Sequence, residues 1–338
     1  MAAATARVLI GAGTLVGVGV WVSGSAGPST VRTASSSTSS TGAPATGAPA
    51  TGTPATGVRL SGAQATGAGA ARARRPVTYY VAIGASESVG VQPMPGYRHG
   101  RRTDDGYAND LAAAERHRWP GLRLVEFGCP GTTLAAAVDG GSVCRYDHGS
   151  QLATAIAFVR AHPSTVLVTV DLGFNDLRPC LAHERVNGAC VTTTLRQIGR
   201  HLHLLLHRLD ATAGRRLHVV GLEHNDPFLG YYLSGPRGRA FAQASVPVFD
   251  RLNAVLRMAY RRAGDAVANV PEAFDVGNRQ LLRMPGHGRV PAEVAKACRL
   301  GWTCSVLRYA HHNVHPNDRG YDAIADAAAA ALGGVRPS

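Results

Sequence analysis

The segment VTYYVAIGASES (residues 77–88) joins an apolar run to a Gly/Ser-rich turn. Residues 77–84 are mainly β-branched, aromatic and small apolar residues with no polar alternation, which is typical of a strand buried on both faces. The turn that follows places Ser86 at the end of this strand. The segment alone fits both a nucleophilic serine and an ordinary loop serine, so the partners must come from other parts of the chain.

Three later segments share the profile of this strand and alternate with helical patterns. They cover residues 122–128, 165–173 and 216–223. The clearest helical pattern places an apolar stripe along residues 195–209, and a last helix is expected after Gly320. Strands that alternate with helices predict a three-layer α/β/α domain of flavodoxin-like form with a central parallel sheet. We expect this domain to span residues 77–333.

The chain before this domain has a different composition. Residues 1–26 combine Arg7 with a short, glycine-rich apolar run and small residues, which predicts a signal peptide; an uncleaved membrane anchor is the alternative. Residues 27–76 contain the repeat TGAPATGAPATGTPATG, and we expect a disordered stalk there. Residues 334–338 form a tail. The protein is therefore expected to be secreted or anchored in the cell envelope.

The six cysteines fall in three close pairs, none of which has the CxxC spacing of a zinc or redox site. Many connectivities are open to six cysteines, but short loops cost least to close. We therefore predict nearest-neighbour disulfides, which suit an exported protein. The pairs are Cys129–Cys144, Cys180–Cys190 and Cys298–Cys304.

The basic residues do not indicate a nucleic-acid partner. The formal net charge is +13, yet six arginines and no acidic residue fall within residues 1–76, which leaves about +7 for the remainder. The basic residues are scattered and are not interleaved with aromatic residues. We expect a monomer that binds no nucleic acid, with membrane or cell-envelope association only through the N-terminus.

Chemically capable residues follow three of the predicted strands and precede the last helix. The segments are GASES (84–88), GCPGTT (128–133), GFND (173–176) and HPND (315–318). The carboxyl ends of parallel strands share one edge of the sheet, so we expect these segments to meet there. Together they supply a hydroxyl, a base and oxyanion donors, which are the groups that acyl transfer to water needs.

In these four blocks the sequence resembles the SGNH, or GDSL-type, hydrolases, and most of all secreted actinobacterial members of esterase/lipase type. The resemblance covers roughly residues 77–333. It implies the SGNH hydrolase fold and hydrolysis of carboxylic esters, with Ser86 as the nucleophile and His315 as the base. It also implies an oxyanion hole built from the N–H groups of Ser86 and Gly131 and the side-chain amide of Asn175.

Two positions depart from the family pattern. Ala85 stands where the family has an aspartate before the serine, and His312 stands where an aspartate usually orients the catalytic histidine. Loss of that orienting function in a triad can cost on the order of 10⁴ in rate, so we expect another group to hold the ring of His315. The backbone carbonyl of His312 is the favoured candidate, with Asp318 and Asp226 as alternatives. A catalytically weak or inactive binding protein is the rival interpretation.

The substrate is expected to be a small-molecule, lipid or glycan ester, and the acyl and alcohol groups stay open. Transfer to an alcohol on cell-envelope glycans or lipids, in place of hydrolysis, is an alternative. Aromatic residues after the fourth strand and between two cysteines are candidates for the pocket wall, with core packing as the other interpretation. They are Phe228, Tyr231 and Trp302.

A metal site at the histidines 311, 312 and 315 is not expected. Pro316 disfavours a helix through this group, and no carboxylate or cysteine joins it at metal-ligand spacing. The predicted reaction also needs neither a metal nor an organic cofactor.

Overall fold

The structure is a computed structural model that describes residues 76–213 and 217–334. The predicted signal peptide or anchor, the stalk apart from its last residue, and the tail apart from its first residue lie outside the described residues. Those assignments stay predictions.

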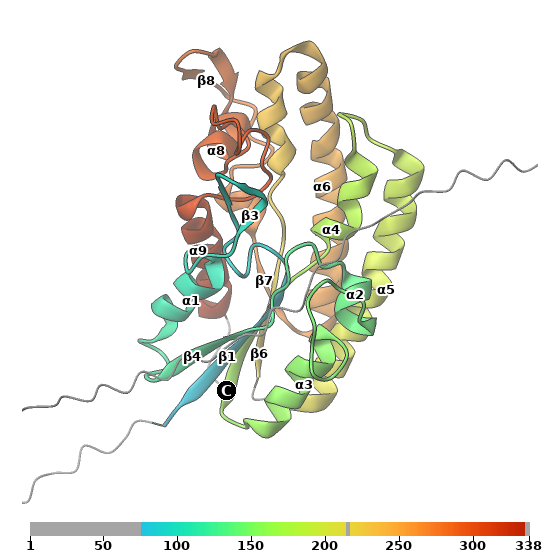
Figure 1. The fold of residues 1–338 in the computed structure, drawn as a ribbon, viewed down its shortest axis with the longest axis vertical. Coiled ribbons are helices and arrows are strands. Elements are labelled where there is room, and N and C mark those ends of the chain that lie inside the picture. Colours follow the sequence, from blue (N-terminus) through green and yellow to red (C-terminus); the bar gives the residue numbers. More distant parts are fainter. Residues whose placement is uncertain (1–75, 214–216, 335–338) are drawn as a thin grey trace, which may run out of the picture. The chain divides into compact units, whose positions relative to one another are not determined.

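A five-stranded parallel sheet forms the middle layer, in the order β4-β1-β5-β6-β7 (Figure 1). Its strands are β1 (Thr78–Gly84), β4 (Leu122–Glu126), β5 (Thr165–Asp171), β6 (His218–Leu222) and β7 (Ala266–Ala268). The interior strands β1 and β5 are almost fully buried, as their uninterrupted apolar runs predict. The predicted parallel sheet is confirmed, and β7 is an additional strand.

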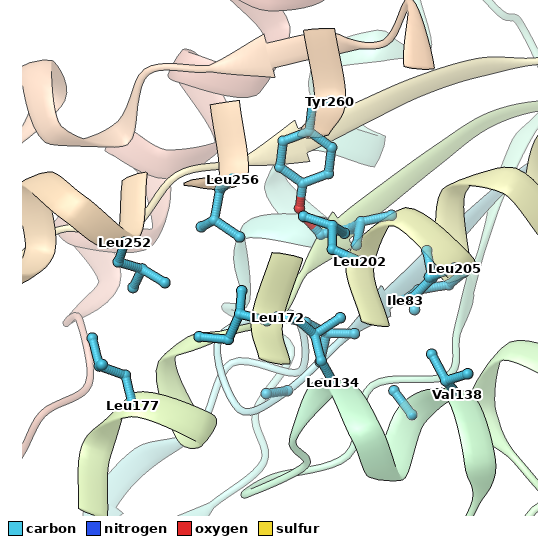
Figure 2. Close-up of a cluster of buried hydrophobic side chains, with 14 of the residues drawn as sticks. Ile83, Leu134, Val138, Leu172, Leu177, Leu202, Leu205, Leu252, Leu256 and Tyr260 are labelled. Atoms are coloured by element: carbon cyan, nitrogen blue, oxygen red, sulfur yellow. The ribbon is translucent and has the colours of Figure 1, made fainter. Parts of the chain in front are cut away.

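Helices cover both faces of this sheet. One face carries α2 (Leu134–Asp139), α3 (Gln151–Ala161), α5 (Gly188–Ala213) and α6 (Gly235–Ala263), and the other carries α1 (Tyr107–Glu115) and α9 (Asp318–Gly333). Figure 2 shows part of the largest core cluster, where Leu202 and Leu205 of α5 lie near Ile83 of β1, and leucines of α6 lie near Leu172, just after β5. The predicted three-layer α/β/α architecture is therefore confirmed.

Short elements lie around the ends of the strands. They are β2 (Gln92–Met94), β3 (Tyr97–Arg101), α4 (Phe174–Leu177), η1 (Arg178–Leu181), η3 (Pro227–Leu233), α7 (Val270–Ala273), β8 (Leu281–Met284), β9 (Gly288–Pro291) and α8 (Ala292–Leu300). Two antiparallel hairpins, β2-β3 and β8-β9, stand outside the main sheet.

The apolar stripe predicted along residues 195–209 is the buried face of α5. Its six members, at positions 195, 198, 202, 205, 206 and 209, are each at most 5% exposed. This face packs against α6 and the sheet, which explains why so long a helix is stable. Of the helices in the described residues, none combines the length and the hydropathy needed to cross a membrane.

The structure contains the three predicted disulfides, Cys129–Cys144, Cys180–Cys190 and Cys298–Cys304. The first joins the loop after β4 to the segment between α2 and α3, the second joins η1 to α5, and the third joins α8 to the loop that follows it. Each fixes a segment next to one end of the sheet, which is the end where the candidate site lies.

Candidate active site

Strand β1 carries Ser86 to the edge of the sheet, where the serine is partly buried. The neighbouring Ser88 is fully buried, and its Oγ donates to the carbonyl of Ala85 at 3.0 Å. A Cβ at Gly84 or Gly128 would come within 2.7 or 2.2 Å of Ser88 Oγ, so these glycines make room for that side chain. Ser88 therefore packs inside the turn, while Ser86 faces the pocket described below.

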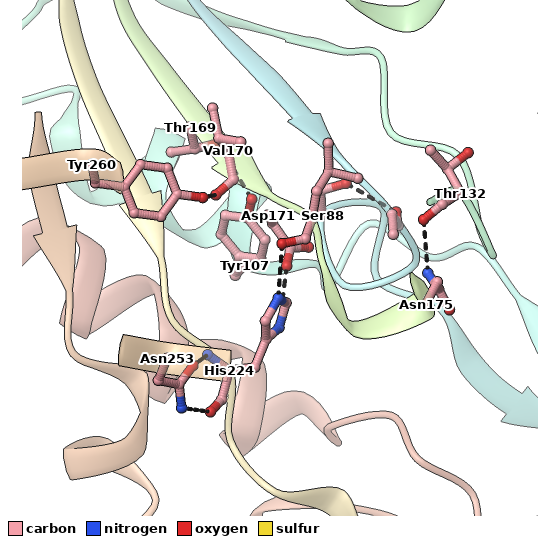
Figure 3. A network of polar contacts seen from close by, with 12 residues as sticks. Ser88, Tyr107, Thr132, Thr169, Val170, Asp171, Asn175, His224, Asn253 and Tyr260 are labelled. Atoms are coloured by element: carbon pink, nitrogen blue, oxygen red, sulfur yellow. Dashed lines mark hydrogen bonds and ion pairs between the residues drawn. The ribbon is translucent and has the colours of Figure 1, made fainter. Parts of the chain in front are cut away.

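The loops after β4 and β5 are joined by two hydrogen bonds. Asn175 Nδ2 donates to the carbonyl of Thr132 at 3.1 Å (Figure 3), and the carboxylate of Asp176 accepts from the N–H of Leu134 at 2.9 Å. An amide nitrogen has two hydrogens, so Asn175 keeps one for another acceptor. Gly131, in the first of these loops, is exposed and has a φ of 80°, a conformation that favours glycine.

A narrow pocket brings the strand-end residues together. Ser86, Asn175 and His315 all line it, and the side chains of Phe174 and Val314 add apolar wall. Gly131 is not among the residues that line the pocket. Within the described residues, Ser86 Oγ and His315 make no hydrogen bond with each other.

The ring of His315 is held by a residue that we did not predict. Asn313 Oδ1 accepts from the backbone N–H of His315 at 2.9 Å and lies 2.8 Å from its Nδ1. A backbone N–H can only donate, so the Asn313 atom in this position is the oxygen. Nδ1 therefore carries the hydrogen, and Nε2 presents a lone pair that can take a proton.

None of the three predicted orienters forms a hydrogen bond with this ring nitrogen in the part of the chain that the structure describes. The side chain of each has another partner: Ser234 for His312, Gln92 for Asp318, and Ser245 for Asp226. His312 has a φ of 53°, and its ring stacks on Tyr231. The family spacing pointed to position 312, whereas the acceptor comes from the next residue along the chain.

Neighbouring segments fix the loop that carries His315. Its carbonyl accepts from the N–H of Trp302 at 3.1 Å, which attaches the loop to the segment closed by the third disulfide. Helix α9 begins immediately afterwards, with Asn317 as its N-cap. From this helix, Tyr321 Oη donates to the carbonyl of Val91 at 2.7 Å, close in sequence to the Ser86 turn.

Burial, and to a lesser extent the positive charge of Arg178, lowers the pKa of His315 to about 4. Burial disfavours the imidazolium because the charged ring loses its hydration. At neutral pH the imidazole is therefore uncharged and able to accept a proton.

This lowered pKa predicts an acid limb at low pH. A base must be unprotonated, so kcat/KM for a neutral ester should rise with pH through the pKa of about 4 and be level from about pH 6 upwards. The measurement is kcat/KM between pH 3 and pH 8, with circular dichroism at each pH to confirm folding. A limb centred near pH 7 in the folded protein would contradict an uncharged His315 ring at neutral pH.

The predicted pocket-wall residues lie elsewhere. Phe228 is buried in an aromatic core cluster and stacks on the back of Phe174. Tyr231 packs on His312, and Trp302 Nε1 donates to Gln92. None of the three lines the pocket. The alternative of core and loop packing is therefore the better description of their positions.

Three other pocket residues were not predicted. Glu87, Asp171 and His224 line the same pocket. Burial raises the pKa of Asp171, although His224 and the N–H groups of Ala85 and Ser88 act in the opposite direction. Burial, with repulsion from Asp171, also raises the pKa of Glu87. The sequence could have identified these three residues as site candidates, because each lies at or just beyond the end of a strand.

The GDSL-like lipase/acylhydrolase family matches this chain over residues 82–323. The chain belongs to this family. The match confirms the resemblance found in the four sequence blocks, and it makes this GDSL-like hydrolase a carboxylic ester hydrolase. No curated protein matches its sequence closely enough to count as a relative.

Several solved structures are similar to this GDSL-like hydrolase at low sequence identity. A putative GDSL-like lipase from Parabacteroides merdae is 13% identical, with a TM-score of 0.48 and coverage of 77% of this chain and 98% of that one. An extracellular lipase from Streptomyces rimosus is 20% identical, with a TM-score of 0.44 and coverage of 75% and 100%. An acetyl xylan esterase from Geobacillus stearothermophilus is 15% identical, with a TM-score of 0.43 and coverage of 77% and 97%.

Proposed function

We propose that this protein is an exported serine esterase in which Ser86 is the nucleophile and His315 the base. The observation that carries the proposal is the shared pocket of Ser86, Asn175 and His315, with the His315 ring held by Asn313 at 2.8 Å. A hydroxyl, a neutral imidazole and an amide donor at one pocket are the parts of an acyl-transfer site.

In the first half-reaction, Ser86 Oγ attacks the ester carbonyl carbon while His315 Nε2 takes the hydroxyl proton. The resulting oxyanion accepts hydrogen bonds from the N–H of Ser86 and from Asn175 Nδ2. The N–H of Gly131, which the family resemblance implies as a third donor, lies outside the pocket lining. The C–O bond to the alcohol then breaks, and the imidazolium returns its proton to the departing alkoxide. The products of this step are the free alcohol and an acyl ester of Ser86.

In the second half-reaction, His315 takes a proton from water as the hydroxide oxygen attacks the acyl carbon. The same donors stabilise the second oxyanion. Collapse of this intermediate breaks the bond to Ser86 Oγ, which regains a proton from the imidazolium. A carboxylic acid leaves, and the resting enzyme is restored with its proton count unchanged.

Export is supported by two independent features. The described residues contain three disulfides, and such bonds persist mainly in oxidising compartments. Residues 1–26 have the composition of a signal peptide, with a membrane anchor as the alternative. The stalk at residues 27–76 would then separate the hydrolase domain from the cell surface or from the cleavage site.

Labelling with a fluorophosphonate tests the catalytic assignment. This reagent phosphonylates a serine that an adjacent base activates, so we expect one covalent adduct, located on Ser86 by peptide mass spectrometry. The variant Ser86→Ala should give no adduct, and Ser88→Ala should still be labelled if it folds. An unlabelled but folded wild-type protein would favour the rival interpretation of a non-catalytic binding protein.

A further inference from the structure

We propose that Glu87, Asp171 and His224 form a binding site for a divalent transition-metal ion, with Zn²⁺ as the best fit. One potential ligand atom from each residue lies within 4.8 Å of the other two. The residues follow or end strands β1, β5 and β6, so one ion would connect three neighbouring strands. This site is separate from the hydrolytic roles proposed above, which need no metal.

The orientation of His224 is the first argument. Its main chain is fixed from both sides by Asn253, whose side chain accepts from the N–H at 2.8 Å and donates to the carbonyl at 2.8 Å. The ring Nε2 lies 3.2 Å from the carbonyl of Leu172, a distance at which an N–H donates to it. Metal-binding histidines commonly donate their second nitrogen to a carbonyl in this way.

The opposite ring nitrogen supplies the second argument (Figure 3). With Nε2 protonated, a neutral His224 has a lone pair at Nδ1, and this atom lies 3.7 Å from Asp171 Oδ1. Two lone pairs that face each other repel unless a cation or a proton lies between them. His224 is 3% exposed and Asp171 is 1% exposed, so water does not replace that partner.

Unpartnered atoms provide the third argument. Within the described residues, His224 Nδ1 and Asp171 Oδ2 are both buried and have no hydrogen-bond partner. A buried polar atom without a partner destabilises a fold, and a bound cation would satisfy both at once. One imidazole and two carboxylates suit Zn²⁺ or Mn²⁺, and of these two the Irving–Williams order favours Zn²⁺.

Glu87 gives the ion a route into the site. It is partly exposed, and it lines the Ser86 pocket together with Asp171 and His224. An ion can therefore enter through the pocket without unfolding the strand ends. Coordination positions that the three side chains leave open would face the pocket and hold water.

The test is titration of the untagged, metal-free full chain with ZnCl₂ by isothermal calorimetry, together with melting temperatures. Every sample carries His203→Ala, because the exposed His203 and His207 lie four residues apart on α5 and can bind Zn²⁺ themselves. We expect Glu87→Gln to lose one Zn²⁺ site. At a free Zn²⁺ concentration of about 100 times Kd, Tm should rise by about 5 °C in the parent and not in Glu87→Gln.

Glu126→Gln is the matched control, because Glu126 is a partly buried carboxylate at the end of β4 that does not belong to the cluster. It should retain the site and the Tm shift. Co²⁺ in place of Zn²⁺ should give visible absorption bands that disappear in Glu87→Gln. Equal Zn²⁺ binding by Glu87→Gln and the parent would overturn the proposal. The absence of any binding would also overturn it, and would indicate that a proton on His224 Nδ1, and not a metal ion, lies between this nitrogen and Asp171. None of these three readouts depends on esterase activity.

Discussion

Replacing Ser86 by alanine should reduce kcat for ester hydrolysis by a factor on the order of 10⁴ or more, and leave the fold intact. The side chain ends in a pocket and is only partly buried, so the smaller residue leaves no large cavity in a core. Loss of the proposed nucleophile should abolish the acyl-enzyme route, and the oxyanion donors alone should give only residual catalysis. The measurement is kcat with p-nitrophenyl acetate, alongside Tm.

A second serine serves as the control for this experiment. Ser88→Ala removes a buried Oγ whose partner is the carbonyl of Ala85, so its main effect should be on stability. We expect Tm to fall while kcat of the folded fraction stays within about tenfold of the wild type. If Ser88→Ala loses activity and Ser86→Ala keeps it, the nucleophile has been assigned to the wrong serine.

Replacing Asn313 by alanine should lower kcat by a factor on the order of 10³ to 10⁴. In the proposed mechanism this residue positions the base, because its Oδ1 lies 2.8 Å from His315 Nδ1 and selects the tautomer that leaves Nε2 free. Without the acceptor, the ring can rotate or carry its hydrogen on the wrong nitrogen. The loss should appear in kcat and only weakly in KM, because Asn313 does not line the pocket.

Asn313→Asp separates a positioning role from a merely structural one. Aspartate keeps an acceptor in the same place, so kcat at pH 8 should stay within about tenfold of the wild type. A carboxylate beside the ring also stabilises the imidazolium and raises the pKa of His315 above its value of about 4. The acid limb should therefore move to higher pH. If kcat in Asn313→Ala equals that of the wild type, another group holds the ring.

Much of the fold could be predicted because β1, β5 and β6 are largely apolar runs separated by helical patterns, which is typical of a parallel sheet buried between helices. Strand β4 lies at the edge of the sheet, where Arg123 is exposed and only Leu122 is fully buried, so the expectation that residues 122–128 are buried on both faces was wrong. Strand β7 was missed because a three-residue segment carries no measurable periodicity. The hairpin β8-β9 was missed for a related reason: its strands have four residues each, and neither shows an alternation of apolar and polar residues. Both leucines of β8 are exposed.

Some pocket residues can be predicted from their positions at strand ends, whereas a contact within one loop cannot. Ser86, Asn175 and His315 lie at strand ends or before the last helix, and the rule that strand ends meet is enough to bring them together. The contact of Asn313 with His315 depends on the path of one loop, which family spacing did not predict. Phe228 was expected at the pocket wall, but its ring stacks on Phe174 and does not line the pocket.

The cluster of Glu87, Asp171 and His224 shows a different limit. Each residue could be found by its position at a strand end, but their mutual approach depends on the order in which strands pair within the sheet. Neighbouring strands β1, β5 and β6 put the three side chains together. Sequence order does not reveal this adjacency, because β4 comes between β1 and β5 in the chain.

The hydrogen bond from Tyr321 on α9 to the carbonyl of Val91 has a consequence for the timing of maturation. Synthesis proceeds from the N-terminus, so a nascent chain contains Ser86 long before it contains His315 and α9. In the proposed mechanism, packing of α9 both places His315, the proton acceptor, and stabilises the turn that carries Ser86. Proteolytic removal of α9 would break this contact, so we expect a chain that lacks the final helix to be inactive.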